Sequence, residues 1–435
     1  MVTRLLAGAA WAALMTLGVP AAAATTPEAP PAALSFAMFG DPAVTAFYAA
    51  RRGAPLWLAD GPGSPAAGEL IQILKRSAAE GLDDGPAYAA QAEALIARAQ
   101  NGDSSALLEA DRLLSTGWVQ YVQLLHRPAA GMIYAEQWVA PRRESASDIL
   151  KLAAAARSPE TYLRSTVAVN PIYAGLRDAA FSQLQATGSP PDPRVIASLD
   201  RVRAFPARGR YVVVDTASAR LWMVDDGRIA DSMKVIVGKP TSQTPMIASA
   251  IHYATLNPYW NVPPDLVRTM IAHNVLSQGP GYLNAHGYQL LSGFGDDPQV
   301  LSAGDVDWKA VADGTAQVRV RQLPGPGNSM GHLKFGFAND AGIFLHDTPK
   351  KELFASDDRD LSNGCIRLED AERLGRWLLG RDPSTDSSDP EQHVLLPSPV
   401  PVYVTYLTAQ AADGRLTYAD DVYGRDSAKE LAALR

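Results

Sequence analysis

The spacing of apolar residues divides the chain into a helical first half and a strand-rich second half. Apolar residues that recur every three or four positions form one face of a helix at Leu114, Trp118, Tyr121, Val122 and Leu125. A second such face, opened by Asn170-Pro171, comprises Tyr173, Leu176, Ala180 and Leu184. We therefore predict a mainly helical scaffold domain over residues 35–188, with His126, its only histidine, at a helix end.

A Pro/Gly-rich break at 187–193, TGSPPDP, ends the helical pattern, and short runs rich in Val, Ile and Tyr follow it. Residues 211–214 and 221–224 are strand candidates, and Asp226-Gly227 predicts a hairpin before a strand that ends at Val237. Further hairpins are predicted between HLKFGF and IFLH, and between VYVTYLT and RLTY around Asp413-Gly414. The predicted fold class is α+β, with a mainly β domain over 195–435.

One segment, residues 257–316, interrupts the strand pattern. It opens with NPYWNVPPDLVRTMIAH, in which Pro263-Pro264 precedes an apolar helical stretch. Because the segment is long for a plain connection, we predict an insertion. Two interpretations stay open: a structural cap over one end of the sheet, or a lid or wall of a substrate cleft.

The first residues resemble a targeting segment. One basic residue, Arg4, precedes the apolar run Leu5 to Val19, and small residues follow up to Ala24. We predict a signal peptide over 1–24, export, and an unstructured linker over 25–34 that is rich in Ala, Pro and Thr. An anchor helix that stays in the membrane is the alternative, and the short apolar run disfavours it. No later segment has 18 uninterrupted apolar residues, so we expect no stable membrane span in the mature protein.

Composition excludes some classes of partner. The chain has 435 residues, of which 47% are hydrophobic, so it is long enough for two or three domains with ordinary cores. Its net charge of -7 gives no basic field for a phosphate backbone. We therefore expect no nucleic acid partner.

The chain has a single cysteine, Cys365. An exported cysteine usually pairs in a disulfide, and a lone one cannot pair within its own chain, although many free cysteines are only small buried hydrophobes. Here the surrounding stretch reads IFLHDTPKKELFASDDRDLSNGCIR, with His346 at the end of a predicted strand. A cysteine reacts as the thiolate, and a nearby histidine can take its proton. We predict Cys365 as nucleophile and His346 as base.

The residues next to Cys365 suggest further roles. Gly364 lets the backbone approach a substrate, and the amides from Asn363 to Cys365 could form an oxyanion hole. Arg367 either favours the thiolate by its charge or forms a structural ion pair. For Asp347, either the carboxylate or the backbone carbonyl could orient the imidazole. We also predict that LEDAERLGRWLLG forms a helix whose N-terminus lies just beyond the cysteine.

A metal site has little support. The remaining histidines show neither helical pair spacing nor a second cysteine nearby: His252, His273, His286, His332 and His393. The adjacent carboxylates Asp357-Asp358 and Asp420-Asp421 fit solvated loops better than acid/base chemistry. We predict no metal and no cofactor.

Together, HDTP and SNGCIR resemble the signature of the YkuD-type L,D-transpeptidase family, a histidine followed by Ser-x-Gly-Cys-x-Arg. The resemblance to the larger periplasmic branch of that family extends over nearly the whole mature chain. The segments that carry it are AFYAARRGAPLW (46–57), VGKPTSQTP (237–245), NPYWNVPP (257–264), RQLPGPGNSMGHLKF (321–335), VYVTYLT and DDVYGRD.

The resemblance implies peptidoglycan cross-linking, and so a role in cell-wall biogenesis and cell shape, in the periplasm of a Gram-negative bacterium. Cys365 would attack the carbonyl of the diamino acid of a stem peptide, expel the terminal D-alanine and form a thioester, which an amine of another stem resolves. His346 would be the base, the backbone around Gly364 would lie in the oxyanion hole, and Ser362 and Arg367 would shape the turn. Carbapenems would acylate the cysteine.

By the same resemblance, the substrate cleft would include Phe344, Tyr259, Trp260 and Asn261. Peptidoglycan stem peptides would be the partners, together with other cell-wall synthesis proteins. Two departures stand out. Many relatives have histidine where this chain has Asn363, and the usual peptidoglycan-binding module has no counterpart between the Tyr173 helix and the Tyr211 strand.

Several functions share this chemistry and stay open. With water as acceptor the same site would be an L,D-carboxypeptidase, and with a lipoprotein amine it would be an anchoring enzyme. A non-enzymatic alternative is a wall-binding scaffold that holds stem peptides without turnover.

Overall fold

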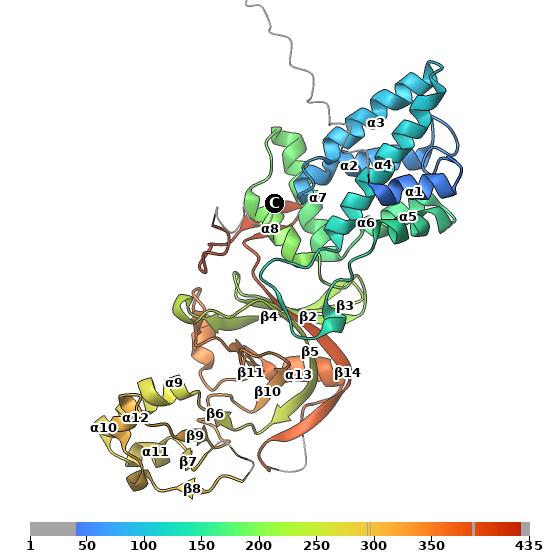
Figure 1. Ribbon diagram of the computed structural model, residues 1–435. Coiled ribbons are helices and arrows are strands. Elements are labelled where there is room, and N and C mark those ends of the chain that lie inside the picture. Colours follow the sequence, from blue (N-terminus) through green and yellow to red (C-terminus); the bar gives the residue numbers. More distant parts are fainter. Residues whose placement is uncertain (1–40, 294, 296, 385–387, 428–435) are drawn as a thin grey trace, which may run out of the picture.

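The computed structural model describes residues 41–293, 295, 297–384 and 388–427. The predicted signal peptide and linker, 1–24 and 25–34, lie outside the described residues. Helices gather at one end of the molecule, a sheet occupies the middle, and a small lobe lies at the other end (Figure 1). The predicted fold class, a helical N-terminal domain followed by a mainly β domain, is confirmed.

The helical domain begins its helices with capping side chains. The carboxylate, hydroxyl or amide oxygen of Asp41, Asp103, Ser145, Ser158, Asn170 and Asp192 accepts a backbone N–H of the first turn. The helices are α1 (Pro42–Ala50), α2 (Pro65–Arg76), α3 (Gly85–Gln100), α4 (Ser104–Leu125), α5 (Ala146–Ala155), α6 (Pro159–Val167), α7 (Pro171–Thr187) and α8 (Pro193–Val202). The predicted apolar face of α4 is buried, and His126 caps the end of that helix.

One buried carboxylate organises the start of this domain. Asp111 of α4 accepts the backbone N–H groups of Leu56, Trp57 and Leu58, at 2.6, 2.8 and 2.7 Å. These bonds hold the extended GAPLW segment against α4, so that the fully buried rings of Trp57 and Trp118 meet edge to face. Three buried residues of the AFYAARRGAPLW segment, Tyr48, Leu56 and Trp57, therefore belong to the helical core.

The main sheet closes on itself. Its strand order is β1-β5-β10-β11-β13-β4-β3-β2-β14, and β14 also pairs with β5, while β12 pairs with β4. The strands are β1 (Ile133–Tyr134), β2 (Arg210–Asp215), β3 (Arg220–Asp225), β4 (Arg228–Gly238), β5 (Ile247–Leu256), β10 (Leu333–Phe337), β11 (Leu345–His346), β12 (Asp360–Ser362), β13 (Ile366–Leu368) and β14 (Gln392–Thr405).

Both faces of β2 are buried, which explains its unbroken apolar run. Val212 and Val214 join the core of the β domain, to which helix α13 (Ala371–Leu379) also contributes. The alternate residues, Tyr211 and Val213, join the core of the helical domain instead. The helical domain is thus packed directly on the outside of the sheet.

Two of the three predicted hairpins are confirmed as written. Asp226-Gly227 joins β3 to β4, and Asn339 to Gly342 lies in the connection from β10 to β11. Asp413-Gly414 also forms a hairpin, but its first strand is β15 (Ala409–Ala412), paired with β16 (Arg415–Tyr418). The VYVT run belongs to β14 of the main sheet, because it pairs there with β2 and β5.

The segment that interrupts the strand pattern folds as a lobe with its own core, which includes Ile271, Leu290 and Val320. Its elements are β6 (Trp260–Asn261), α9 (Pro264–Leu266), α10 (Ala272–Gln278), α11 (Gly281–Ala285), β7 (Tyr288–Leu291), β8 (Val300–Leu301), α12 (Trp308–Ala312) and β9 (Arg319–Gln322). Because β9 pairs with both β6 and β7, the lobe extends past residue 316 to Gln322. Among the described helices of the whole chain, none is both long and apolar enough to cross a membrane.

Candidate active site

Strand pairing brings the predicted nucleophile and base together. Strands β11 and β13 are parallel neighbours, with His346 opposite Arg367, and the N–H of Ile366 donates to the carbonyl oxygen of Phe344 at 2.9 Å. Cys365 directly precedes β13, so the 18 residues between His346 and Cys365, which include β12, form a connection that returns the chain to the neighbouring strand.

Cys365 and His346 line one cleft, with a volume of about 380 Å³, between the sheet and the lobe. The lobe contributes Trp260, Pro263, Leu266, Met270, Tyr282, His286, Tyr288 and Gln322. The β domain contributes Gly327, Ser329, Met330, His346, Lys350, Ser362, Asn363, Cys365 and Arg367. Although the chain is acidic overall, none of these lining residues is Asp or Glu. The charged residues of the cleft are cations, which favours an anionic ligand.

The thiol of Cys365 is half-buried and donates to the carbonyl oxygen of Gly342, with 3.6 Å between Sγ and O. Burial raises the pKa of this thiol, while the nearby Arg367 and Lys334 oppose the increase. The resting cysteine is therefore a neutral thiol, which requires a base at the moment of reaction.

His346 is buried, and its Nδ1 lies 2.6 Å from the carbonyl oxygen of Asp347. Because a carbonyl can only accept, Nδ1 carries the proton, and the lone pair is on Nε2. Burial lowers the pKa of His346 to about 4, and the charge of Arg367 acts in the same direction. The imidazole is therefore neutral at neutral pH, in the tautomer that can accept a proton through Nε2.

The Asp347 carboxylate has other partners. It accepts Lys351 Nζ at 2.7 Å and the backbone N–H of His332 at 3.0 Å. Of the two orienting groups considered for His346, the structure thus uses the backbone carbonyl.

The turn before Cys365 is held by Ser362. Its buried hydroxyl accepts the N–H of Gly364 at 3.0 Å and donates to the carbonyl oxygen of Cys365 at 2.6 Å. Gly364 has a φ of 120°, which favours glycine. Its N–H is occupied by Ser362, whereas the N–H of Cys365 has no hydrogen-bond acceptor among the described residues. Within the predicted stretch from Asn363 to Cys365, the N–H groups of Asn363 and Cys365 are thus both available to an oxyanion, and that of Gly364 is not.

The structure favours one of the two roles considered for Arg367. Its half-buried guanidinium lines the cleft, and no ion pair holds it among the described residues. Burial lowers its pKa, and the proximity of Cys365 opposes this. The arrangement favours a charge beside the thiol over a structural ion pair.

The predicted helix forms within LEDAERLGRWLLG, but its N-terminus does not lie just beyond the cysteine. Cys365 is followed by β13, and α13 begins only at Ala371, capped by the side chain of Asp370. The Ile-Arg-Leu run pairs with β4 and β11 and is therefore drawn into the sheet. Cys365 therefore stands directly before a strand and not at a helix N-terminus.

Of the four residues predicted for the substrate cleft, Trp260 lines it and the others do not. Tyr259 lies under the guanidinium of Arg321, and Asn261 accepts a hydrogen bond from Arg319 at 3.3 Å. The ring of Phe344 lies 5.2 Å from Lys334 Nζ. These three side chains are used in packing beside the cleft.

Several lining residues have no local signal in the sequence. Tyr282, His286 and Tyr288 form an aromatic group on the lobe, with ring centroids 4.3 to 6.4 Å apart, and Lys350 lines the cleft from the β domain. Only the tertiary placement of the lobe brings the three rings to the cleft. Among the described residues, no group of three or more His, Cys, Asp or Glu side chains could hold a metal ion.

Comparison with known proteins shows two matched domains. Residues 209–402 match the model of the L,D-transpeptidase catalytic domain, YkuD, and residues 42–179 match that of the Scaffold domain. A Haemophilus influenzae protein named as a proposed L,D-transpeptidase is 26% identical over 403 residues, which cover 90% of this chain and 80% of that protein.

Similarity to solved structures is weak. An L,D-transpeptidase from Mycobacterium smegmatis matches at 12% identity with a TM-score of 0.24, over 46% of this chain and 60% of that one. A mutant Enterococcus faecium L,D-transpeptidase matches at 14% identity with a TM-score of 0.23, over 46% and 52%. The two domain matches follow one another along most of the chain, which therefore belongs to the L,D-transpeptidase family and is an enzyme with a Scaffold domain ahead of a YkuD catalytic domain.

Proposed function

We propose that this enzyme cross-links peptidoglycan stem peptides through a thioester on Cys365. The observation that carries the proposal is the cleft itself, in which the half-buried thiol of Cys365 and the neutral imidazole of His346 share one wall. A cysteine and an adjacent histidine base are the minimum set for acyl transfer.

The reaction follows from these atoms. Nε2 of His346 takes the thiol proton, and the sulfur attacks the carbonyl carbon of the diamino acid in the donor stem. The tetrahedral oxyanion is stabilised by the N–H of Cys365. Collapse breaks the bond to the terminal D-alanine, whose amine takes the proton from His346, and leaves a thioester. The amine of an acceptor stem then attacks the thioester, forms the new amide and releases the thiol.

The charges of the cleft suit such a substrate. A stem peptide carries carboxylates, and Arg367 and Lys350 are the cations lining the cleft that could bind them. The lobe supplies an apolar and aromatic wall opposite, with Leu266, Met270 and Tyr282. This wall supports the cleft interpretation of the insertion over a purely structural cap.

The proposal includes export to the periplasm, because the substrate lies outside the cytoplasm, and release of residues 1–24. The N-terminal residue of protein purified from a periplasmic extract tests this part. Association with other cell-wall synthesis proteins is a further part of the proposal.

Intact mass of the purified enzyme after incubation with a carbapenem, and separately with a tetrapeptide stem, tests the function. We expect an adduct on the wild type and none on Cys365→Ser. A dimeric stem product identifies the cross-linking reaction, whereas a tripeptide alone identifies the carboxypeptidase alternative. Stem binding by both proteins without an adduct on either would instead support the non-enzymatic scaffold.

A further inference from the structure

Two segments that carry the family resemblance, VGKPTSQTP (237–245) and DDVYGRD (420–426), meet beside the Cys365 turn although neither lines the cleft. They are joined by Gln243, whose side-chain amide donates to the carbonyl oxygen of Tyr423 at 3.1 Å. Because they have no direct access to substrate, any effect on the reaction has to pass through the residues that they hold.

The contact with the active site is made by Thr244, which is fully buried. Its hydroxyl accepts the N–H of Gly238 at 2.9 Å and donates to the carbonyl oxygen of Gly364 at 2.6 Å. The fit is close at this point, since a Cβ on Gly238 would lie 2.2 Å from the carbonyl oxygen of Ser242. Thr244 is thus tied on one side to strand β4 and on the other to the turn before the nucleophile.

The carbonyl of Gly364 and the N–H of Cys365 belong to the same peptide unit. In a planar trans peptide these two groups point in opposite directions, so a bond that holds the carbonyl also determines the direction of the N–H. Ser362 holds the preceding peptide through the N–H of Gly364. We propose that Thr244 is a positioning residue, which holds the Gly364–Cys365 peptide so that its N–H stays directed at the oxyanion. This inference rests on the proposed function.

The C-terminal segment holds Thr244 in turn. Arg425 donates to the carbonyl oxygen of Thr244 at 2.8 Å and to the side chain of Gln243 at 3.2 Å. The hydroxyl of Tyr423 donates to the carbonyl oxygen of Gly238. Both ends of the 238–244 loop are therefore tied to the C-terminal segment, and Arg425 is a second positioning residue, acting through Thr244.

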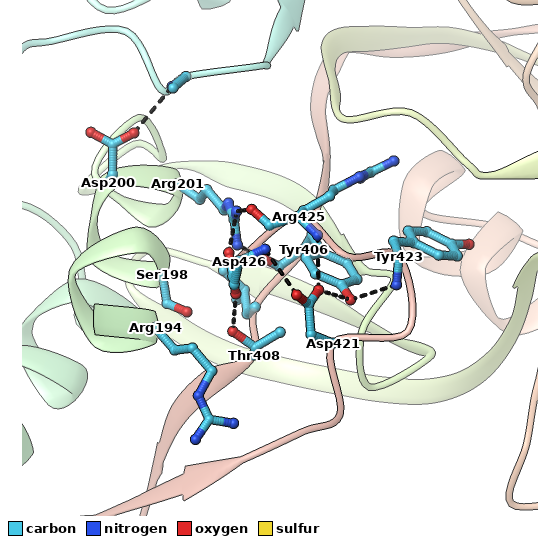
Figure 2. Close-up of polar contacts among 12 residues, drawn as sticks. Arg194, Ser198, Asp200, Arg201, Tyr406, Thr408, Asp421, Tyr423, Arg425 and Asp426 are labelled. Atoms are coloured by element: carbon cyan, nitrogen blue, oxygen red, sulfur yellow. Dashed lines mark hydrogen bonds and ion pairs between the residues drawn. The ribbon is translucent and has the colours of Figure 1, made fainter. Parts of the chain in front are cut away.

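This segment is anchored on the helical side of the molecule (Figure 2). Asp426 forms a buried ion pair with Arg201 of α8 at 2.6 Å, and it also accepts the hydroxyl of Thr408. Asp421 accepts the hydroxyl of Tyr406 at 2.7 Å and the backbone N–H groups of Arg425 and Asp426. A continuous set of hydrogen bonds therefore runs from α8 to the peptide unit of the nucleophile.

Two reactions of the same thiol test the role of Thr244. Acylation by a carbapenem passes through an oxyanion, whereas alkylation by iodoacetamide needs only the thiolate. In Thr244→Val we expect acylation to slow by about tenfold or more, less than the 10²–10³ lost when an oxyanion donor is removed, with alkylation within about twofold of the wild type. Thr244→Ser, which keeps the hydroxyl, should restore acylation.

Arg425→Met tests whether Arg425 acts on the reaction through Thr244, with Arg194→Met as the matched control. Figure 2 shows Arg194 directed away from Arg425, and its guanidinium lies over the ring of Tyr418, 4.5 Å from its centroid. In Arg425→Met, acylation should slow while the rate of alkylation stays close to that of the wild type. In Arg194→Met, the rate of acylation should stay unchanged. If Thr244→Val does not fold, this comparison decides the proposal.

Two results would overturn the inference: unchanged acylation in both the Thr244→Val and Arg425→Met variants, or equal slowing of acylation and alkylation. A wild type that forms no acyl adduct would count against the proposed function instead, so the two failures are distinguishable.

Discussion

Nδ1 of His346 is bound to the backbone carbonyl of Asp347, 2.6 Å away, and the carboxylate of Asp347 is bound elsewhere. The residue that follows the base in sequence therefore orients the ring through its main chain. Because every residue has a carbonyl, the tautomer of His346 does not depend on which side chain stands at position 347.

We expect Asp347→Asn to keep most of the acylation activity. Where a carboxylate orients a catalytic histidine directly, the same change costs about 10⁴ in kcat. Here it weakens a half-exposed ion pair with Lys351, which contributes at most about 1 kcal/mol, so kcat/KM should fall by no more than about fivefold. Carbapenem acylation rates measure this, with His346→Gln as the inactive control. A loss near that of His346→Gln would show that the carboxylate orients the base.

The low pKa of His346 predicts a pH dependence of stability. Between about pH 4 and 6.5 the unfolded chain binds a proton at this histidine and the folded chain does not. Stability contributed by the neutral ring is therefore complete above pH 6.5 and is lost as the pH falls toward 4. Relative to His346→Gln, the wild-type free energy of unfolding should fall by about 2 kcal/mol between pH 7.5 and 5.

Urea unfolding of both proteins at the two pH values measures this difference. Subtracting the variant removes the contribution of other groups, such as the buried Asp215, whose pKa burial raises to about 6. Parallel changes in both proteins would show that His346 is not the group that titrates.

Local patterns predicted much of the fold. Asp-Gly pairs identified two hairpins, and Asn170-Pro171 identified the start of α7, because these signals act through the backbone of neighbouring residues. The strand β13 was missed, since its three residues are extended by pairing with β4 and β11 rather than by their own preference.

The candidate site likewise contains some residues that the sequence predicted and others that it did not. His346, Cys365 and Ser362 lie in one continuous motif and meet through adjacent strands, so that sequence alone pointed to them. Tyr282 and Thr244 are more than 80 and 120 positions from Cys365, and only packing of the lobe and the 238–244 loop brings them to the site. No local pattern records such contacts.

Arg367 should bind the terminal carboxylate of the donor stem. Its guanidinium lines the cleft beside Cys365 without an ion-pair partner among the described residues. A charge-assisted hydrogen bond of this kind contributes about 1.5 to 3 kcal/mol. In Arg367→Gln we expect kcat/KM for a tetrapeptide acid to fall more than about tenfold, and much less for the same peptide with a C-terminal amide. Equal losses on both peptides would mean that Arg367 acts on the thiol of Cys365 and does not bind the terminal carboxylate. Arg376→Gln, at a position 46% exposed and outside the cleft, serves as the comparison.

The lobe should bind the stem peptide without taking part in the chemistry, and Trp260→Ala tests this. Trp260 lines the cleft on the lobe side, so its truncation removes contacts made equally in the ground state and the transition state. We expect KM for the tetrapeptide to rise by about tenfold, a loss of about 1.4 kcal/mol, with kcat little changed. Carbapenem acylation should change less than tetrapeptide turnover, because the smaller molecule leaves more of the lobe uncontacted. Trp138→Ala, which removes a tryptophan that is 56% exposed and does not line the cleft, is the matched control. A fall in kcat with unchanged KM would mean that the lobe instead shapes the transition state.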